Sequence, residues 1–261
     1  MTLDILMITT LGFLGLAIGF VGGLVGLVLG VVRFPLILGA TGTSAAISAG
    51  TNIGISTLGA FAAAIGHFRQ NNVHRRIFIT MAVTGAAGAF LGSLLTRFVP
   101  VAVLLLSIGV IVSYEAFSLI KNSRKVQKSD KVSKPIDTNS VLSAESVIGF
   151  GIGFLGGLVG LVLGSIRVPA MISILKMEPR VAVGTNLAAS SIIGTAGLLG
   201  HVLNNEVDFQ IFAVMGSTAM VGGYIGSKFT SRFNATTLKL IIGIVLAFVA
   251  AIMFLRVALT S

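Results

Sequence analysis

The sequence predicts an all-α polytopic membrane protein. We expect two inverted-topology repeats of about five membrane segments each, including discontinuous helices. Three observations support this fold class. The chain of 261 residues is 55% hydrophobic and only 10% charged, whereas a soluble domain carries about 25% charged residues. It contains 33 glycines, which are frequent where membrane helices pack closely or break. It also repeats itself. We therefore expect a multi-pass protein of the cell membrane.

The repeat is long and keeps its register. Residues 19–35 recur as residues 153–169 with 13 of 17 positions identical, at an offset of 134 residues. The same offset places the Gly-Thr-Asn of residues 50–52 onto residues 184–186. A register held this long in apolar sequence indicates an internal duplication.

We divide the chain accordingly. Residues 1–120 form a first transmembrane repeat, residues 121–143 a basic cytoplasmic linker, and residues 144–261 a second transmembrane repeat.

The spans of the first half follow from the length that a membrane helix needs, which is about 20 apolar residues. The first apolar region is long enough for two spans, and we place the turn between them near Gly22 and Gly23. Pro35 removes a backbone donor and clashes with the preceding helical turn. We therefore expect it to open the second of two half-helices. The predicted spans are 3–21, 24–41, 43–66, 77–96 and 100–120.

The second half repeats this plan, with Pro169 in the place of Pro35. Its predicted spans are 145–155, 158–175, 179–202, 208–229 and 235–257.

An odd number of spans per half gives the two halves opposite orientations. With five spans each, 14 basic side chains outside the membrane fall on the cytoplasmic side and two on the other. With four spans each and one orientation, the distribution is ten and six. Cytoplasmic loops carry the excess of Lys and Arg, so the sequence favours inverted repeats.

Each repeat contains one arginine inside its glycine-rich apolar run, Arg33 and Arg167. Inverted repeats of discontinuous helices are typical of secondary transporters, whose sites lie near the midplane. An arginine at the bilayer centre costs at least about 2.5–3.5 kcal/mol on insertion scales, so two of them indicate a use. Arginine stays protonated and offers only donors, which makes an anion the fitting ligand.

The candidate substrate site joins these charges to neutral donors. Helix N-termini at Pro35 and Pro169 would add backbone N–H groups and a positive dipole end. Side chains from the neighbouring helices complete the set, which is Arg33, Arg167, Thr51, Asn52, Thr185, Asn186, Pro35 and Pro169. His67 and His201 are candidate coupling residues.

Structural alternatives exist for each of these residues. The arginines could extend to the membrane interface, the Thr-Asn pairs could bond neighbouring helices, and the histidines could cap helix ends. The Gly88/Gly92 and Gly222/Gly226 pairs fit packing seams within one subunit better than a dimer face.

Several classes of site are missing from the sequence. Cysteine is absent, which excludes disulfides and thiolate metal sites. We find no nucleotide-binding loop, no metal-ligand spacing and no nucleophile–base pair. We therefore expect no enzyme activity, no cofactor, no metal and no nucleic acid. The expected partners are a small anionic substrate and membrane lipid, with a homodimer left open.

One family shows this arrangement of motifs. The chain has a glycine-rich first hairpin ending in Pro, then Gly-Thr-Asn, then a helix ending in Gly before the Asn205-Glu206-Val207-Asp208 turn. In both halves this order resembles the sulfite exporter TauE/SafE family, also called TSUP. The resemblance covers nearly all of the chain outside the linker. It implies a plasma-membrane permease for sulfite, sulfonates or related sulfur oxyanions.

Two features depart from the expected family pattern. An arginine stands two residues before each motif proline, where we expect an apolar residue in many members. Val73-His74 also stands where the second half has Val207-Asp208.

The resulting hypothesis is a transporter for a small sulfur-containing oxyanion, such as sulfite or an organosulfonate, which works by alternating access. The alternatives are an anion channel and a non-transporting membrane scaffold that binds a partner through its basic loops.

Overall fold

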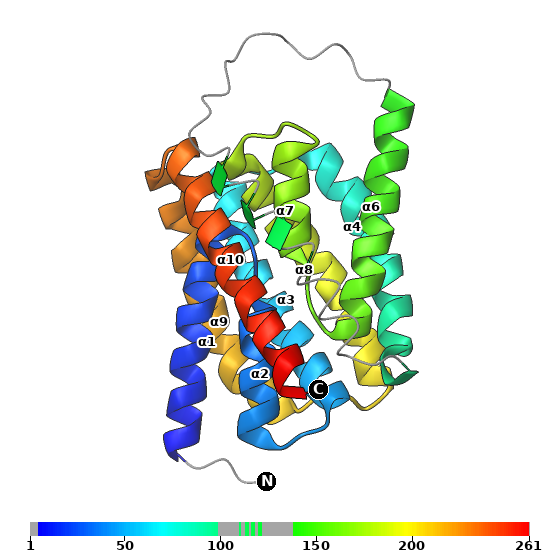
Figure 1. Ribbon diagram of the computed structural model, residues 1–261, viewed down its shortest axis with the longest axis vertical. Helices are drawn as coiled ribbons and strands as arrows, with labels where there is room; N and C mark the ends of the chain where they lie inside the picture. Colours follow the sequence, from blue (N-terminus) through cyan, green and yellow to red (C-terminus); the bar gives the residue numbers. More distant parts are fainter. Residues whose placement is uncertain are drawn as a thin grey trace.

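The computed structural model describes residues 5–98, scattered positions between 110 and 121, and residues 138–260. Within these ranges the regular structure is helical throughout and contains no strand (Figure 1). The predicted all-α class is therefore confirmed. The predicted span 100–120 falls mostly outside the described residues, as do residues 122–137 of the predicted linker. The division into two repeats and a linker remains a prediction.

The helices follow the predicted order. In the first half they are α1 (Ile5–Val25), α2 (Gly30–Thr41), α3 (Ala45–Arg69), α4 (Arg75–Leu94) and the 3₁₀ turn η1 (Thr96–Phe98). In the second half they are α6 (Thr138–Val159), α7 (Gly164–Ser173), α8 (Pro179–Leu203), α9 (Phe209–Phe229), η2 (Thr230–Arg232) and α10 (Ala235–Thr260).

Local capping explains where α3, α4 and α9 begin. Ser44 Oγ accepts a hydrogen bond from the Ile47 N–H at 3.3 Å. His74 Nδ1 accepts from Ile77 N at 3.4 Å, and Asp208 Oδ1 accepts from the Ile211 N–H at 3.0 Å. Such caps satisfy amides that have no partner inside the helix. His74 and Asp208 occupy equivalent positions, so this departure between the halves is a change of capping residue.

The predicted turn at Gly22 and Gly23 was wrong. Both residues lie inside α1, which continues to Val25. The chain reverses after it, at Gly26, which has φ +77°. Glycine adopts such left-handed backbone at little cost, and this is why the reversal falls there.

The prediction that a proline opens each half-helix was also wrong. α2 begins at Gly30 and continues through Pro35. α7 begins at Gly164 and contains Pro169. A proline at the sixth helical position lies just past the first turn, whose N–H groups have no helical partner in any case. It therefore removes only one backbone bond there.

α2 and α7 are too short to cross a membrane. Twelve and ten residues at 1.5 Å per residue make helices of about 18 and 15 Å, half of a hydrocarbon core of about 30 Å. Each follows a long helix after a short non-helical connection, residues 26–29 and 160–163.

The two halves interleave. α1 packs on α9 and α6 packs on α4, so the first helix of each half lies against the fourth helix of the other. α3 contacts α9, α4 contacts α8, and α3 and α8 contact each other. Figure 1 shows that α1 begins at the end of the molecule that holds the N-terminus, whereas α6 begins at the opposite end.

Glycines allow the two interleaved pairs to approach closely. A Cβ atom added to Gly88 of α4 would lie 2.8 Å from Phe154 N of α6. One added to Gly222 of α9 would lie 2.8 Å from Phe20 N of α1. Small residues of this kind permit backbone contact between membrane helices. These glycines therefore form seams within one chain, as predicted.

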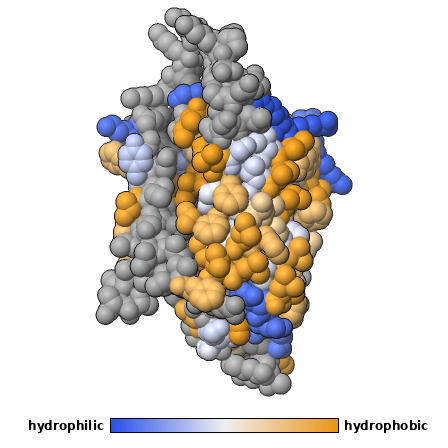
Figure 2. All heavy atoms as spheres, turned by 90° about the vertical axis from the view of Figure 1, so that its right-hand side faces the viewer, coloured by the Kyte–Doolittle hydropathy of each residue, from blue (hydrophilic) through white to orange (hydrophobic). Residues whose placement is uncertain are grey.

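The outer surface suits a lipid environment. By length and composition, five helices of the described residues could cross a membrane: Ile5–Val25, Ala46–Arg69, Arg75–Leu94, Pro179–Leu203 and Phe209–Arg232. Figure 2 shows one face, on which apolar side chains cover the middle and polar ones gather toward the ends. The exposed apolar side chains of α4 and α6 include Ile79, Val83, Val147 and Phe150. A multi-pass membrane protein is therefore confirmed.

Two glycines of α6 provide a test of the interleaved packing. A Cβ at Gly153 would lie 2.8 Å from the Gly85 Cα, whereas one at Gly151 would meet nothing within 4 Å. We expect Gly153→Ala to lower the stability of the detergent-solubilised protein by about 1–3 kcal/mol through overpacking. Gly151→Ala should leave stability unchanged or raise it by up to about 1 kcal/mol. Thermal denaturation followed by size-exclusion chromatography measures both, and equal midpoints would contradict the α4–α6 contact.

Candidate functional site

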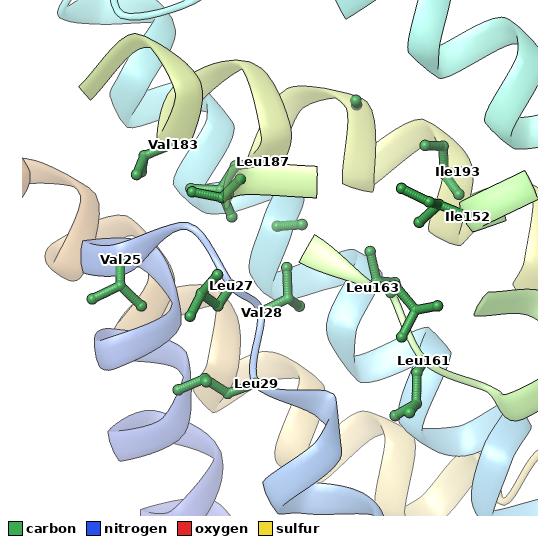
Figure 3. Packing of buried hydrophobic residues seen from close by; sticks show 14 of the residues in the cluster. Val25, Leu27, Val28, Leu29, Ile152, Leu161, Leu163, Val183, Leu187 and Ile193 are labelled. Carbon is green, nitrogen blue, oxygen red and sulfur yellow. The ribbon is translucent and has the colours of Figure 1, made fainter. Parts of the chain in front are cut away.

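Two connections with the same sequence meet inside the molecule. Residues 26–29 and 160–163 both read Gly-Leu-Val-Leu, and we call them the first and second central loops. Leu27 and Leu161 are buried. Figure 3 shows Val28 of one loop beside Leu163 of the other, and the leucines and valines of both loops belong to one buried cluster. The loops lie where the short helices begin, so they set the positions of α2 and α7.

Two asparagines hold these loops reciprocally. Asn52 Nδ2 of α3 donates to the Gly160 carbonyl at 2.9 Å. Asn186 Nδ2 of α8 donates to the Gly26 carbonyl at 2.5 Å. Both asparagines are fully buried. Because the two bonds are related by the repeat offset, each half holds the central loop of the other half.

Arg33 projects from the first turn of α2 and is only 1% exposed. Its Nε donates to Asn52 Oδ1 at 3.1 Å, and its Nη2 donates to Ser56 Oγ at 2.6 Å. The same nitrogen lies 3.5 Å from the Val28 carbonyl oxygen. Arg33 is therefore an interior residue and does not extend to the membrane interface.

Arg167 occupies the equivalent position in α7 and is equally buried, but it has fewer partners. Its Nη2 donates to Ser190 Oγ at 2.9 Å. In the part of the chain that the structure describes, Nε and Nη1 of Arg167 and Oδ1 of Asn186 have no hydrogen-bond partner. The bond equivalent to Arg33–Asn52 is therefore not formed. Buried polar groups are normally satisfied, so each of these three atoms requires an explanation.

The space beside Arg33 is small. A cavity of about 10 Å³ lies among α1, α2, α3 and α9, room for about one water molecule. It is lined mostly by small residues: Gly19, Gly22, Gly23, Val28, Arg33, Gly59, Ala60, Leu187 and Ala219. A sulfur oxyanion does not fit this cavity.

The two predicted threonines contact helix connections. Thr51 Oγ1 accepts from the Asp208 N–H at 2.8 Å, and Thr185 Oγ1 accepts from the His74 N–H at 2.9 Å. Each hydroxyl thus accepts a hydrogen bond from the N–H of the residue that caps a helix of the other half. The described contacts join the arginines to asparagine and serine, and do not join either arginine to these threonines.

The predicted prolines lie one turn away from the helix starts. Pro169 is inside α7, two residues after Arg167. The backbone places Pro35 at the corresponding point of α2. The N-termini of the short helices therefore lie at Gly30 and Gly164, and not at the prolines. The Gly164 N–H donates to the Val162 carbonyl oxygen at 2.8 Å.

The two histidines are also buried and equivalent. His67 Nε2 lies 3.3 Å from the Gly23 carbonyl oxygen, and His201 Nε2 lies 3.3 Å from that of Gly157. Each ring thus links the end of α3 or α8 to the last turns of α1 or α6. His201 has a second contact, because its Nδ1 lies 2.8 Å from Glu206 Oε2.

The sequence did not predict four further candidate functional residues. Ser56 and Ser190 look like ordinary helix residues, although the repeat offset relates them and could have identified them. Glu206 looks like a loop residue. Glu145 is 2% exposed near the start of α6, and its Oε2 has no partner among the described residues. It stands at the end of a predicted span, where a carboxylate carries no signal.

Comparison with known proteins identifies the family. The family model described as "Sulfite exporter TauE/SafE" matches residues 11–253. A "Probable membrane transporter protein YdhB" of Bacillus subtilis (strain 168) is 26% identical over 199 residues, which are 73% of this chain and 77% of the relative. A "Probable membrane transporter protein" of Xylella fastidiosa (strain 9a5c) is 27% identical over 239 residues, 90% and 89% of the two chains. No solved structure matches significantly.

The match spans both halves, and the curated relatives are named as transporters and not as enzymes. The described helices are long and apolar enough for a multi-pass membrane protein. The chain belongs to the sulfite exporter TauE/SafE family of membrane transporters.

Proposed function

We propose that this protein is a secondary transporter for a small sulfur-containing oxyanion, such as sulfite or an organosulfonate. It works by alternating access between two inverted repeats. The single observation that carries the proposal is Arg167, a buried guanidinium with two nitrogens that have no partner among the described residues. The family description supplies the sulfur oxyanion.

An anion is the ligand that best satisfies Arg167. The guanidinium has five N–H donors and no acceptor, and a single neutral partner, Ser190, occupies one nitrogen. A buried cation without a counter-charge is costly. Charge-assisted bonds to an oxyanion would satisfy the free nitrogens and neutralise the charge. Arg33 has protein partners instead of an anion. Its Nε bonds Asn52 and one terminal nitrogen bonds Ser56.

The unpaired oxygen of Asn186 restricts which oxyanions suit the site. It is a buried acceptor without a partner, and it corresponds to the Asn52 oxygen that bonds Arg33. An acceptor favours a ligand that carries a donor of its own. This suits hydrogen sulfite, or a sulfonate bearing an amine, better than a fully deprotonated dianion.

The inverted arrangement has three supports. α1 and α6, equivalent by the repeat offset, begin at opposite ends of the molecule (Figure 1). The Asn52 and Asn186 bonds are reciprocal between the halves, as a two-fold relation requires. The basic residues also favour two halves of opposite orientation. We therefore keep the division into repeats 1–120 and 144–261, with the short helices α2 and α7 as the discontinuous elements.

Alternating access is supported by a difference between identical sequences. In the first central loop Val28 and Leu29 have φ of 60° and 48°, whereas Leu163 in the second has φ of −74°. The first loop precedes the helix of Arg33, which has side-chain partners. The second loop precedes the helix of Arg167, which is partly unpaired. One sequence therefore adopts two conformations in one molecule. If the two loops exchanged these conformations, Arg33 would become the partly unpaired arginine and Arg167 the paired one.

In this cycle Arg33 and Arg167 supply charge in turn, and Asn52 and Asn186 position the loops. Thr51 and Thr185 fix the neighbouring connections, while Pro35 and Pro169 lie within the helices that carry the arginines.

Ligand-induced stabilisation tests the anion site. We expect sulfite to raise the unfolding temperature of the purified wild type and to have no effect on Arg167→Gln. At a ligand concentration of a hundred times Kd, the stabilisation is about 2.7 kcal/mol. Sulfate, thiosulfate, sulfoacetate, taurine and chloride are compared in the same thermal-shift assay. Arg33→Gln is the matched control: it should lower stability without ligand, because Asn52 and Ser56 lose a buried partner. Equal sulfite responses in wild type and Arg167→Gln would remove Arg167 from the site.

Flux measurements distinguish a transporter from an anion channel. In proteoliposomes we expect sulfite uptake to saturate and to be accelerated by sulfite loaded inside, because a single site alternates between the two sides. Arg167→Lys keeps the charge but loses the planar fork, and uptake should fall by about tenfold or more. Uptake that rises linearly with concentration and ignores internal sulfite would indicate a channel instead.

A further inference from the structure

His201 has two ring contacts, one to a backbone carbonyl and one to the carboxylate of Glu206. Its Nε2 lies 3.3 Å from the Gly157 carbonyl oxygen, to which it donates when it carries a ring hydrogen. Its Nδ1 lies 2.8 Å from Glu206 Oε2. A bare ring nitrogen and a bare carboxylate are both acceptors, so a contact this short requires a proton between them. With two protons the pair is imidazolium with carboxylate or imidazole with carboxylic acid, and its net charge is zero. With one proton it is a neutral imidazole that donates from Nδ1 to the carboxylate.

The first half provides an internal comparison. His67 has the same bond from Nε2, to the Gly23 carbonyl, but its Nδ1 has no partner among the described residues. Asn72 stands where the second half has Glu206. An amide side chain does not bind a proton near neutral pH. Both halves therefore have the contact between the histidine ring and a glycine carbonyl. The described contact between the ring and a carboxylate belongs to the second half.

The pair is shielded by neutral residues of the neighbouring helices. A Cβ added to Gly50 of α3 would lie 2.8 Å from His201 Cβ, and one added to Gly200 of α8 would lie 3.0 Å from Ser93 Cβ of α4. α6 contributes Gly157, whose carbonyl also accepts from Thr96 Oγ1 at 3.3 Å.

Two charged residues stand near the pair along the chain. Asp208 is two residues beyond Glu206, and its Oδ1 is engaged by the N–H groups of Gln210 and Ile211. Arg97 directly follows Thr96 in the sequence. Asp208 makes no described contact with the pair, and the described ionisable partner of His201 is Glu206.

The pair has a route to solvent. The Glu206 side chain is 9% exposed, whereas that of His201 is fully buried. Glu206 belongs to the connection between α8 and α9 at the end of the molecule. A proton can therefore reach the carboxylate from the surface and pass to the ring over a single 2.8 Å contact.

We propose that His201 and Glu206 form a proton-binding site that loads and releases one proton during transport, which couples anion movement to the proton gradient. This inference rests on the proposed transport function. Release of the shared proton leaves a neutral imidazole and a carboxylate, and the proton passes to solvent. The single remaining ring hydrogen then lies between Nδ1 and the carboxylate, so Nε2 has no hydrogen to donate and the bond from His201 to the Gly157 carbonyl is lost. The Glu206 N–H still donates to the His201 carbonyl oxygen at 2.8 Å.

The pair is linked to the anion site through α6. Gly157, the acceptor of His201, lies in the last turn of α6, directly before the second central loop. That loop is followed by α7 and Arg167. A change at His201 therefore acts on the backbone that positions Arg167, and this makes the histidine a positioning residue and not an anion ligand.

The experiment compares wild type with Glu206→Gln and Asp208→Asn. Glutamine preserves the shape of the side chain but cannot release a proton, and asparagine at position 208 preserves the helix cap while removing a nearby carboxylate. Protein is reconstituted in vesicles of phosphatidylethanolamine and phosphatidylglycerol with a pH-sensitive dye inside. A sulfite gradient should move protons with sulfite in wild type and Asp208→Asn. Glu206→Gln should still bind sulfite in the thermal-shift assay but lose the accompanying proton movement.

A second readout needs no substrate. Infrared difference spectra of the purified protein, taken across a pH titration, should show one carboxyl–imidazole transition in wild type and Asp208→Asn that is missing in Glu206→Gln. Identical spectra in all three proteins, or equal proton movement in wild type and Glu206→Gln, would overturn the proton site. A normal transition in a protein that neither binds nor moves sulfite would instead refute the proposed substrate and leave the proton site standing.

Discussion

The central architecture depends on two buried hydrogen bonds, from Asn52 to the Gly160 carbonyl and from Asn186 to the Gly26 carbonyl. A non-helical backbone inside a membrane protein must find partners within the protein, because lipid offers none. The two bonds meet this need for loops that interrupt α1–α2 and α6–α7. They also join the halves, since each asparagine reaches across to the other repeat. The short helices, and with them both arginines, are positioned by these contacts.

Duplication produced equal sequences but unequal environments. Arg33 bonds Asn52, whereas Arg167 leaves Asn186 Oδ1 without a partner. Asn72 stands in the first half where Glu206 stands in the second, and the His67 Nδ1 has no described partner whereas the His201 Nδ1 contacts Glu206. Because the equivalent residues around each pair are nearly the same, each difference reflects either the conformation of one half or a residue that differs between the halves. The second half contains both the partly unpaired guanidinium and the His201–Glu206 pair, so it differs from the first in the two features on which the proposed anion and proton sites rest.

The sequence predicted the helical class, the order of most spans and the equivalence of the two halves. These features depend on long apolar segments and on a repeat that needs no three-dimensional information. The breaks at Gly26 and Gly160 were missed because several glycines in each run could reverse the chain. The choice among them depends on long-range packing, of α1 against α9 and of α6 against α4. The contact between His201 and Glu206 was missed because it joins a helix end to a loop residue five positions later. Nothing in that spacing distinguishes a proton-binding pair from an ordinary exposed turn.

The interleaving of the halves has a consequence for biosynthesis. Gly15, Gly19 and Gly23 of α1 approach the backbone of α9, and α9 begins 184 residues after α1 ends (209 − 25). Until α9 is inserted, this face of α1 therefore has only lipid or another helix against it. Domains that are completed early can fold early, but here the N-terminal half cannot reach its final packing before the C-terminal half is inserted. Assembly within the bilayer must therefore follow the insertion of α9.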